Sequence, residues 1–280
     1  MNKLSIEKRT QILNMLLEGS SLRATSRMAD VSINTVTKLL VDAGKACQTF
    51  HNETVMNVAS KRIQCDEIWS FVYAKDKNAP AEMKEAGEAG DVWTWVGIDA
   101  DSKFVISWLV GDRSSETAIP FMHDLASRLA NKVQLTSDGH KVYLIAIEEA
   151  FTNIDYAILH KIYGKGGGKG SDARYSPAEC IGIEKVPVMG NPDEKHISTS
   201  YIERQNLTMR MHMRRFTRLT NGFSKKVENH CYALALHYMY YNFIKIHKTL
   251  RVTPAMEAKI TGKLFEISDI VRMIDGEKIL

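Results

Sequence analysis

The sequence has few cysteines and no long apolar run. Its four cysteines, Cys47, Cys65, Cys180 and Cys231, include no Cys-x-x-Cys pair. This argues against a zinc ribbon and against a disulfide framework, and it suits a reducing cytoplasm. No stretch reaches the roughly 18 uninterrupted apolar residues of a membrane span, and the opening segment MNKLSIEKRT lacks the apolar run of a signal peptide. We therefore expect a cytoplasmic protein without a membrane partner.

A strong overall charge is also absent. The formal net charge is +4, and 44% hydrophobic with 25% charged residues is ordinary for a globular protein. At 280 residues the chain has room for one large domain with satellites or for two domains. Because the total charge is only mildly basic, local clusters of charge are more informative about function than the sum.

Residues 1–46 predict three helices, each preceded by a serine that can cap it: Ser5, Ser21 and Ser32. The third helix is expected to begin at residue 33, to run to about residue 42 and to close at Gly44. Two short helices around a tight turn resemble a helix-turn-helix, although helical hairpins without a DNA function share this pattern.

In a helix-turn-helix the second helix of the pair enters the major groove of DNA. Asn34, Thr35, Thr37 and Lys38 would then be exposed near bases and phosphates. Residues 1–62 carry nine Lys and Arg against five Asp and Glu, which agrees with a DNA-binding role.

The rest of the chain predicts a mixed α/β domain. We expect strands at residues 62–73, 92–99, 104–111, 132–137 and 180–187, and helices at about 115–131, 146–163 and 201–216. This order of elements is that of a ribonuclease H-like sheet with flanking helices. The expected organisation is a helix-turn-helix domain at 1–48, a linker at 49–62, a ribonuclease H-like domain at 63–222 and a C-terminal helical extension at 223–280.

Three acids stand at positions that suit a metal site. Asp66 lies inside the first strand, where a charge is costly unless it is paired or bound to a metal. Asp138 ends a later strand and is followed by Gly139, which allows close backbone approach, and Glu203 lies on the later helix. If the strands are adjacent, the three carboxylates meet at one edge of the sheet. Carboxylates suit Mg²⁺ or Mn²⁺, and two such ions promote in-line displacement at phosphorus.

Other acids compete with these three, because 33 Asp and Glu make some such triple inevitable. Glu67 adjoins Asp66, but successive strand residues face opposite sides, so we expect only one of them to join the site. We favour Asp66, whose choice leaves Trp69 and Phe71 to an opposite, apolar face.

Several further features have ordinary explanations. Asp99 and Asp101 suit a hairpin turn, and Glu148 and Glu149 suit a helix surface. His140 could orient a water, contact DNA or lie on the surface. The run GKGGGKGS at 164–171 lacks the Gly-Lys-Ser/Thr order of a phosphate-binding loop and is expected to be a flexible loop.

Glu203 is the one acid in a basic stretch. Residues 198–226 carry seven Lys and Arg, which suits a polyanion such as DNA. On a helix, one stripe is apolar and expected to be buried: Ile202, Met209, Met213 and Phe216. Glu203 shares the neighbouring flank with Asn206, Leu207, Arg210 and Arg214. It could bind a metal, or it could form salt bridges on a solvated basic helix.

Four motifs together resemble bacterial insertion-sequence transposases of the DDE class, of the insertion-sequence-one type. They are QCDEIWSFV, WTWVGIDADSKFVISWLVGDRSSET, LTSDGHKVY and the long YIERQNLTMRMHMRRFTRLTNGFSKKVENH, and the resemblance spans about residues 64–258. Relatives carry an N-terminal zinc ribbon, whose cysteine pairs this chain lacks.

The resemblance implies a metal-dependent DNA transposase that cleaves the element ends and joins the 3′-hydroxyl to target DNA. By matching motif, the catalytic and metal-binding residues would be Asp66, Asp138 and Glu203, with Arg204, Asn206, Arg210 and Arg214 holding phosphates or ordering the acids. The implied partners are double-stranded DNA, at the terminal inverted repeats and at the target, and further copies of the chain. The implied location is the bacterial cytoplasm, at the nucleoid. A catalytically silent DNA-binding protein and a metal-dependent nuclease without strand transfer are the alternatives.

Overall fold

The computed structural model describes residues 3–164, 179–217 and 221–279. Apart from Gly164, the glycine-rich run expected to be a loop lies outside the described residues. Within the described part of the chain, six strands form one mixed sheet in the order β3-β2-β1-β4-β5-β6. The strands are β1 (Arg62–Val72), β2 (Gly90–Asp99), β3 (Val105–Gly111), β4 (Gln134–Ser137), β5 (Asp155–Tyr163) and β6 (Cys180–Met189).

The sheet combines both strand directions. β1, β2 and β3 are antiparallel neighbours, β4 pairs parallel with β1, β5 pairs parallel with β4, and β6 returns antiparallel to β5. The parallel crossovers use the helices α5 (Ser115–Arg128) and α6 (Val142–Ala150). The predicted α/β sheet with flanking helices is therefore confirmed.

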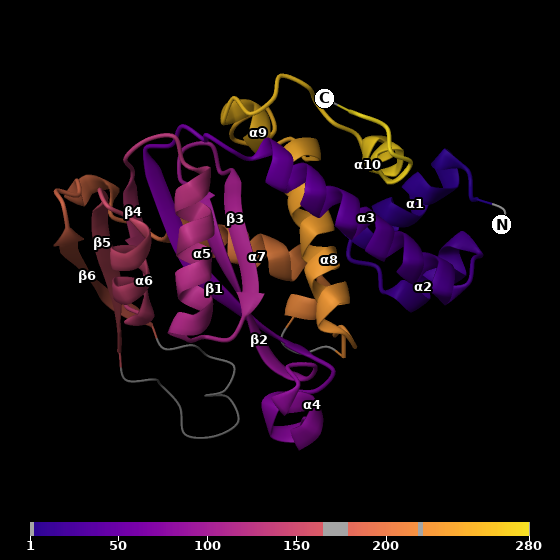
Figure 1. The fold of residues 1–280 in the computed structure, drawn as a ribbon, viewed down its shortest axis with the longest axis horizontal. Helices are drawn as coiled ribbons and strands as arrows, with labels where there is room; N and C mark the ends of the chain where they lie inside the picture. The colour runs from indigo at the N-terminus through magenta and orange to yellow at the C-terminus, as the bar shows by residue number, and fades with distance from the viewer. Residues whose placement is uncertain (1–2, 165–178, 218–220, 280) are drawn as a thin grey trace.

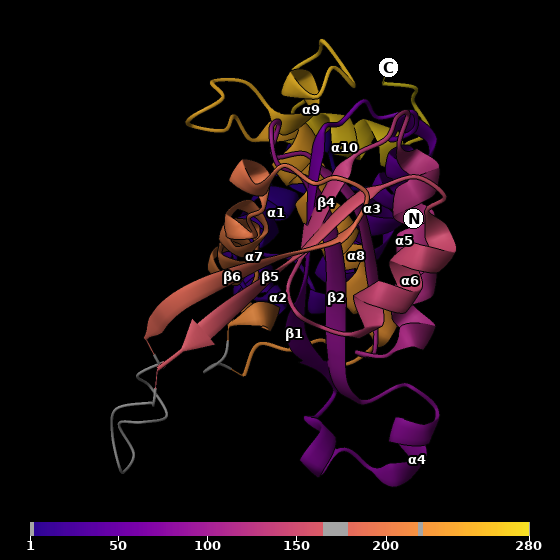
Figure 2. The same ribbon diagram turned by 90° about the vertical axis from the view of Figure 1, so that its left-hand side faces the viewer.

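Helices cover both faces of the sheet. α5 and α6 lie on one face and α7 (Ser200–His212) lies on the other, as Figures 1 and 2 show. α8 (Val227–Met239) shares the face with α7: its Tyr238 packs on Trp108 of β3, with ring centroids 4.6 Å apart. Trp108 and Asp66 lie on one face because both pair with Val96 of β2. Asp66 consequently faces α7 and α8.

One predicted helix is wrong in its second half. Residues 146–163 were expected to be helical, but α6 ends at Ala150 and residues 155–163 form strand β5. The four residues 156–159 are all buried, because β5 lies inside the sheet between β4 and β6. Such a strand is an unbroken apolar run, which does not show the alternation that distinguishes a strand from a helix.

The three N-terminal helices are present: α1 (Ile6–Leu17), α2 (Leu22–Ala29) and α3 (Ile33–Thr54). The side chains of Ser5, Ser21 and Ser32 cap them as predicted. α3 does not close at Gly44 but continues to Thr54, through most of the first half of the expected linker. Gly44 is a packing residue, since a Cβ there would lie 2.3 Å from Cβ of Tyr232 in α8.

The C-terminal segment packs on the N-terminal helices. A π-helix (Tyr240–Ile244) follows α8, and α9 (Pro254–Glu257) and α10 (Ile267–Ile274) complete the chain. Arg9 of α1 makes two 2.7 Å hydrogen bonds to the carboxylate of Asp275, just after α10. The Phe50 ring of α3 packs edge-on against Phe243 and Phe265. Among the described residues, no helix is both long and apolar enough to cross a membrane.

The segment 73–89 joins β1 to β2. It contains a short 3₁₀ turn (Asp76–Asn78) and the five-residue helix α4 (Ala81–Glu85), which lies below the sheet in Figure 1. Trp69 and Phe71, at the same end of β1, are only half-buried. They lie on the face opposite Asp66 as expected, with Trp93 and Phe223 as aromatic neighbours, but this part of that face is open to solvent. The more deeply buried face at this end of β1 is the one under α8, where Ser70 approaches His230.

Candidate active site

The candidate site lies where β1 and β4 separate. These strands pair only along Arg62–Gln64 and Gln134–Thr136, and β1 next meets a partner on that side at Val72, which bridges to Ser224. Asp66 lies in this open part of β1, and Asp138 comes directly after β4. Carboxylate oxygens of Asp66, Glu67 and Asp138 lie within 4.8 Å of one another. The expectation that Asp66 and Asp138 meet at the sheet edge agrees with this geometry.

The expectation that only one of Asp66 and Glu67 could join the site is wrong. The two side chains do leave β1 on opposite faces: Asp66 Oδ2 accepts a 2.8 Å hydrogen bond from Asn206 of α7, whereas Glu67 lies on the face of Trp95, its partner in β2. Both can reach Asp138 because no strand fills the space beside β1 at this point.

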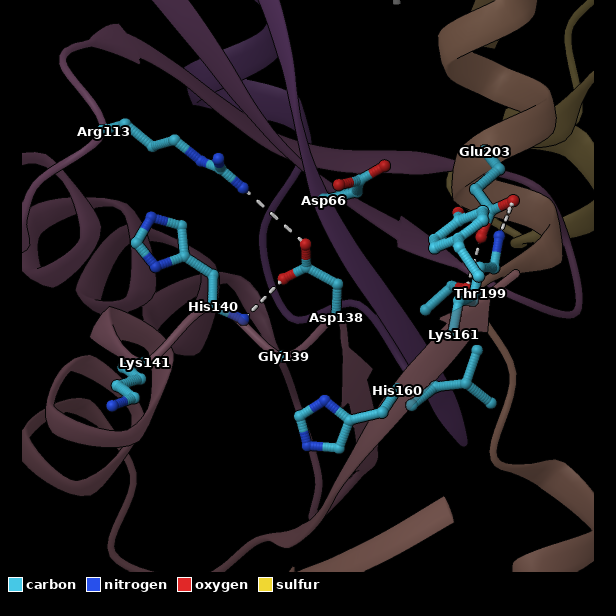
Figure 3. A pocket seen from close by; sticks show the side chains of 12 residues that line it. Asp66, Arg113, Asp138, Gly139, His140, Lys141, His160, Lys161, Thr199 and Glu203 are labelled. Carbon is cyan, nitrogen blue, oxygen red and sulfur yellow. Dashed lines mark hydrogen bonds and ion pairs between the residues drawn. The ribbon is translucent and has the colours of Figure 1, made fainter. Parts of the chain in front are cut away.

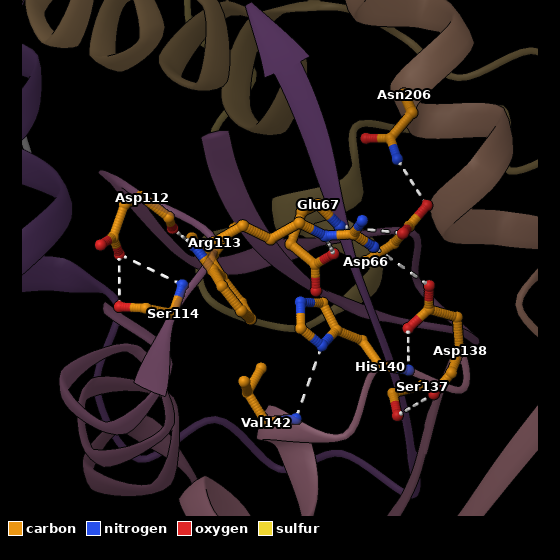
Figure 4. A network of polar contacts seen from close by, with 11 residues as sticks. Asp66, Glu67, Asp112, Arg113, Ser114, Ser137, Asp138, His140, Val142 and Asn206 are labelled. Atoms are coloured by element: carbon orange, nitrogen blue, oxygen red, sulfur yellow. Dashed lines mark hydrogen bonds and ion pairs between the residues drawn. The ribbon is translucent and has the colours of Figure 1, made fainter. Parts of the chain in front are cut away.

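Arg113 bridges two of these acids, and the sequence analysis did not identify it. It lies in the turn between β3 and α5, with its Nε 3.2 Å from Glu67 Oε2 and its Nη2 3.8 Å from Asp138 Oδ2. The guanidinium carbon lies 4.6 Å from the centre of the Trp93 ring. Figure 4 shows the guanidinium extended between Glu67 and Asp138. The one hint of Arg113 in the sequence is its position next to Ser114, the residue that caps the following helix.

Glu203 lies across the pocket from this group. It stands in the first turn of α7, where its Oε2 is 2.5 Å from Lys161 Nζ and its Oε1 accepts a 2.5 Å hydrogen bond from the Thr199 hydroxyl. Figure 3 shows Asp66 and Asp138 between Arg113 on one side and Glu203 on the other. The ion-pair partner of Glu203 is thus a lysine of β5.

The three predicted acids line one pocket of about 800 Å³. Its wall also carries five nitrogen-bearing side chains, which are Arg113, His140, Lys141, His160 and Lys161. Gly139 belongs to the same wall, and a Cβ there would lie 2.4 Å from the His160 ring. The predicted close approach at Gly139 is therefore confirmed. A pocket that combines carboxylates with basic groups suits a phosphate substrate held with a metal ion.

Strand β1 also anchors the helix that carries Glu203. Gln64 Oε1 accepts hydrogen bonds from the backbone N–H groups of Tyr201 (2.9 Å) and Ile202 (3.1 Å). These donors belong to the first turn of α7, where no intrahelical acceptor exists. Thr199, at the N-cap position of α7, makes no side-chain capping bond. The amide of a buried glutamine two residues before Asp66 takes that role.

Two of the acids, Asp66 and Glu67, are buried where the protein stabilises their charged forms poorly. Burial raises the pKa of Asp66 from 3.8 to about 7, and the nearby Asp138 and Glu203 add to the rise. Burial likewise raises the pKa of Glu67 from 4.5 to about 7. Glu67 Oε1 is buried and has no hydrogen-bond partner among the described residues. Hard oxygen donors that include an unpartnered buried oxygen fit a divalent cation such as Mg²⁺ or Mn²⁺.

His140 supports the site through its backbone. Its N–H donates a 3.0 Å hydrogen bond to Asp138 Oδ1. Its ring packs near Trp95 and Tyr143 on the α6 side of the sheet, and burial lowers the pKa of the imidazole. Ordering Asp138 through the backbone is a role that the sequence did not suggest, and the water and DNA roles of the His140 side chain remain predictions.

The residues expected to contact DNA are divided between two regions. Asn34 and Lys38 are exposed on α3, and Lys38 Nζ lies 2.5 Å from Asp42. Thr35 and Thr37 are half-buried, with hydroxyls bonded to the Ser32 hydroxyl and to the Ile33 carbonyl. These four residues do not line the described pocket. The reading role of α3 remains a prediction.

The residues predicted on the Glu203 helix differ in exposure. Arg204 and Arg214 are exposed and Arg210 is half-buried. Asn206 is buried and donates to Asp66, so of its two expected roles the structure displays the ordering of an acid. The predicted apolar stripe is confirmed, because all four of its side chains are buried: Ile202, Met209, Met213 and Phe216.

The four acids that the sequence explains as turn or helix-surface residues occupy the positions expected. Asp99 ends β2 and accepts hydrogen bonds from Ser60 and Ser102, and Asp101 pairs with Arg62 in the same turn region. Glu148 and Glu149 are exposed on α6. All four cysteines are free.

No family model matches the chain, and no curated protein sequence matches it. Among solved structures, it resembles a pre-cleavage Mos1 transpososome (11% identity, TM-score 0.23) and a Mos1 transposase paired-end complex with the left transposon end (11% identity, TM-score 0.22). Each match covers 55% of this chain and 60% of the other. Endonuclease V from Bacillus subtilis matches with 16% identity and a TM-score of 0.21, over 42% of this chain and 54% of that one. Similarity this low identifies neither a family nor an activity.

Proposed function

We propose that this protein is a metal-dependent DNA transposase with a ribonuclease H-like fold, in which Asp66, Asp138 and Glu203 are the catalytic carboxylates. One observation above all supports the proposal: three acids from distant chain segments line one pocket together with basic side chains. The sequence motifs that resemble insertion-sequence transposases contain the same three acids.

Asp66, Asp138 and Glu203 would hold Mg²⁺ or Mn²⁺, in two ions as phosphoryl transfer of this kind requires. Such ions stabilise charge on the attacking and leaving oxygens of an in-line displacement at phosphorus. The carboxylates fit this role because hard cations prefer oxygen ligands and because Asp66 is buried close to Asp138 and Glu203, which raises its pKa to about 7.

The chain's own residues would position the substrate and the acids. Lys141 and Lys161 on the pocket wall are suited to non-bridging phosphate oxygens. Asn206 orders the Asp66 carboxylate through its 2.8 Å hydrogen bond. Gln64 holds the first turn of α7, and with it Glu203, against β1. Correct placement of reacting groups is a large part of the rate enhancement in phosphoryl transfer.

DNA would be held by surfaces outside the pocket. We propose that α3 reads the element's terminal repeats through Asn34, Thr35, Thr37 and Lys38, and that α7 and the following turn contact phosphates through Arg204, Arg210 and Arg214. Two element ends must be brought together before joining, so the working form would be a homo-oligomer on double-stranded DNA. A bacterial insertion sequence would act at the nucleoid in the cytoplasm.

The first test is cleavage of end-labelled duplexes that carry the DNA flanking the gene, with a scrambled duplex as control. Purified protein is incubated with Mg²⁺ and, in parallel, with EDTA. We expect metal-dependent nicking at one position that leaves a 3′-hydroxyl, and transfer of that strand into a supercoiled plasmid. Nicking without transfer would indicate a nuclease. Tight binding without nicking would contradict the enzymatic proposal.

A further inference from the structure

Glu67 has a buried oxygen, Oε1, that accepts no hydrogen bond of good geometry among the described residues. Its side chain has no solvent exposure. The buried hydroxyl of Tyr143 lies near Glu67, and its interaction counteracts part of the rise that burial causes in the Glu67 pKa, but it makes no hydrogen bond of good geometry. A buried carboxylate oxygen in this state is costly unless a positive group compensates it. Glu67 also belongs to the group of oxygens within 4.8 Å that includes Asp66 and Asp138.

Arg113 compensates this group only in part. One guanidinium faces three carboxyl groups, and it reaches Glu67 at 3.2 Å and Asp138 at 3.8 Å, with no contact to Asp66 within 4.0 Å. Charge-assisted hydrogen bonds of this kind are normally about 2.7–2.9 Å long. Arg113 is also 41% exposed and lies in a turn, so it can leave the carboxylates without breaking a strand or a helix. The guanidinium also stacks on the Trp93 ring, and this cation–π contact does not depend on the carboxylates.

We infer that Glu67 is a fourth acidic residue of the metal site, and that Arg113 occupies that site as a counter-charge which a divalent cation displaces. The inference rests on the proposed metal-dependent function and adds residues that the sequence motif does not assign. Glu67 belongs to the oxygens that lie within 4.8 Å of one another with Asp66 and Asp138, whereas Glu203, the third proposed acid, is paired with Lys161 and Thr199 across the pocket.

The two cations compete for the same oxygens. A divalent ion carries twice the charge of a guanidinium and approaches carboxylate oxygens to about 2.0–2.1 Å in the case of Mg²⁺. Its attraction to the acids therefore exceeds that of Arg113 at the distances observed. Removing Arg113 should consequently strengthen metal binding. If Arg113 served only to hold Glu67 in position, removing it would weaken metal binding, so the direction of the change separates the two roles.

The test is a titration of the full-length protein with Mn²⁺ in the absence of DNA, in which the free ion is quantified by its electron paramagnetic resonance signal. The variants are Glu67→Gln and Arg113→Gln. The matched controls are Glu148→Gln and Arg27→Gln, which make the same charge changes at exposed positions on α6 and α2. Circular dichroism verifies that each variant is folded.

We expect Glu67→Gln to weaken Mn²⁺ binding at least tenfold and Arg113→Gln to tighten it at least threefold, with both controls unchanged. Unchanged affinity in both site variants, or weaker binding in Arg113→Gln, would overturn this inference while leaving the proposed function in place. If Glu67→Gln does not fold, the direction of the Arg113→Gln change alone decides. A wild-type protein that binds no Mn²⁺ would overturn both the inference and the proposed metal dependence.

Discussion

Replacing Gln64 with methionine tests how the site is held together. Methionine has nearly the same length but no hydrogen-bond acceptor of comparable strength, so the N–H groups of Tyr201 and Ile202 lose their partner. The Ile202 donor is buried, and an unsatisfied buried donor costs about 1–3 kcal/mol. The Tyr201 donor is partly buried, and loss of a helix cap of this kind costs about 0.5–2 kcal/mol. We therefore expect the free energy of unfolding to fall by about 1.5–5 kcal/mol.

Gln64→Glu is the matched control, because a carboxylate still accepts both N–H bonds and is favoured at a helix N-terminus. Urea unfolding measures the free energy of each variant, and hydrogen exchange of the Ile202 amide reports on the first turn of α7. We expect Gln64→Met to accelerate that exchange and Gln64→Glu to leave it close to wild type. A Gln64→Met protein within about 0.5 kcal/mol of wild type would refute the reasoning, since surface substitutions that break no contact change stability by that little.

Three further predictions concern packing, pH and DNA affinity. Gly44→Ala should lower the free energy of unfolding by about 1–3 kcal/mol in urea, because overpacking against Tyr232 outweighs the roughly 1 kcal/mol gained from helix propensity; a more stable variant would contradict this. Burial lowers the pKa of His237 from 6.5 to about 3, so the folded protein keeps it neutral while the unfolded chain protonates below pH 6.5. Wild type should therefore lose stability relative to His237→Phe as the pH falls from 7 to 5, by up to about 1.4 kcal/mol per unit, and a pH-independent difference would rule this out. Lys38→Ala should weaken DNA binding and reduce the salt slope by about one, as measured by fluorescence anisotropy, and unchanged affinity would reject α3 as the reader.

The parts of the site that depend on local pattern could be predicted from the sequence. An acid inside an apolar strand, an acid before a glycine at a strand end and an acid in a basic helix are each unusual in one window of the chain. Asp66, Asp138 and Glu203 line one pocket because the strands that carry two of them are neighbours. The serine caps of the N-terminal helices are likewise local signals.

The parts that depend on distant packing could not be predicted. Alternation along β1 correctly separates Asp66 from Glu67, but it does not reveal that the strand edge is open beside them. Arg113 reaches the acids only because the turn after β3 lies over that opening. Gly44 suggests a helix end in the sequence, because its packing against Tyr232 of α8 is visible only in the folded chain. The apolar run of β5 fits a helix or a buried strand equally well until its neighbours are known.

The most direct test of the central claim compares wild type with Asp66→Asn on the same labelled duplex in Mg²⁺. Asparagine keeps the size of the side chain but removes the charge that would hold a metal ion. The account predicts that Asp66→Asn binds the duplex with wild-type affinity and produces no detectable nicking. Nicking at the wild-type rate by Asp66→Asn would contradict the assignment of this pocket as the catalytic site.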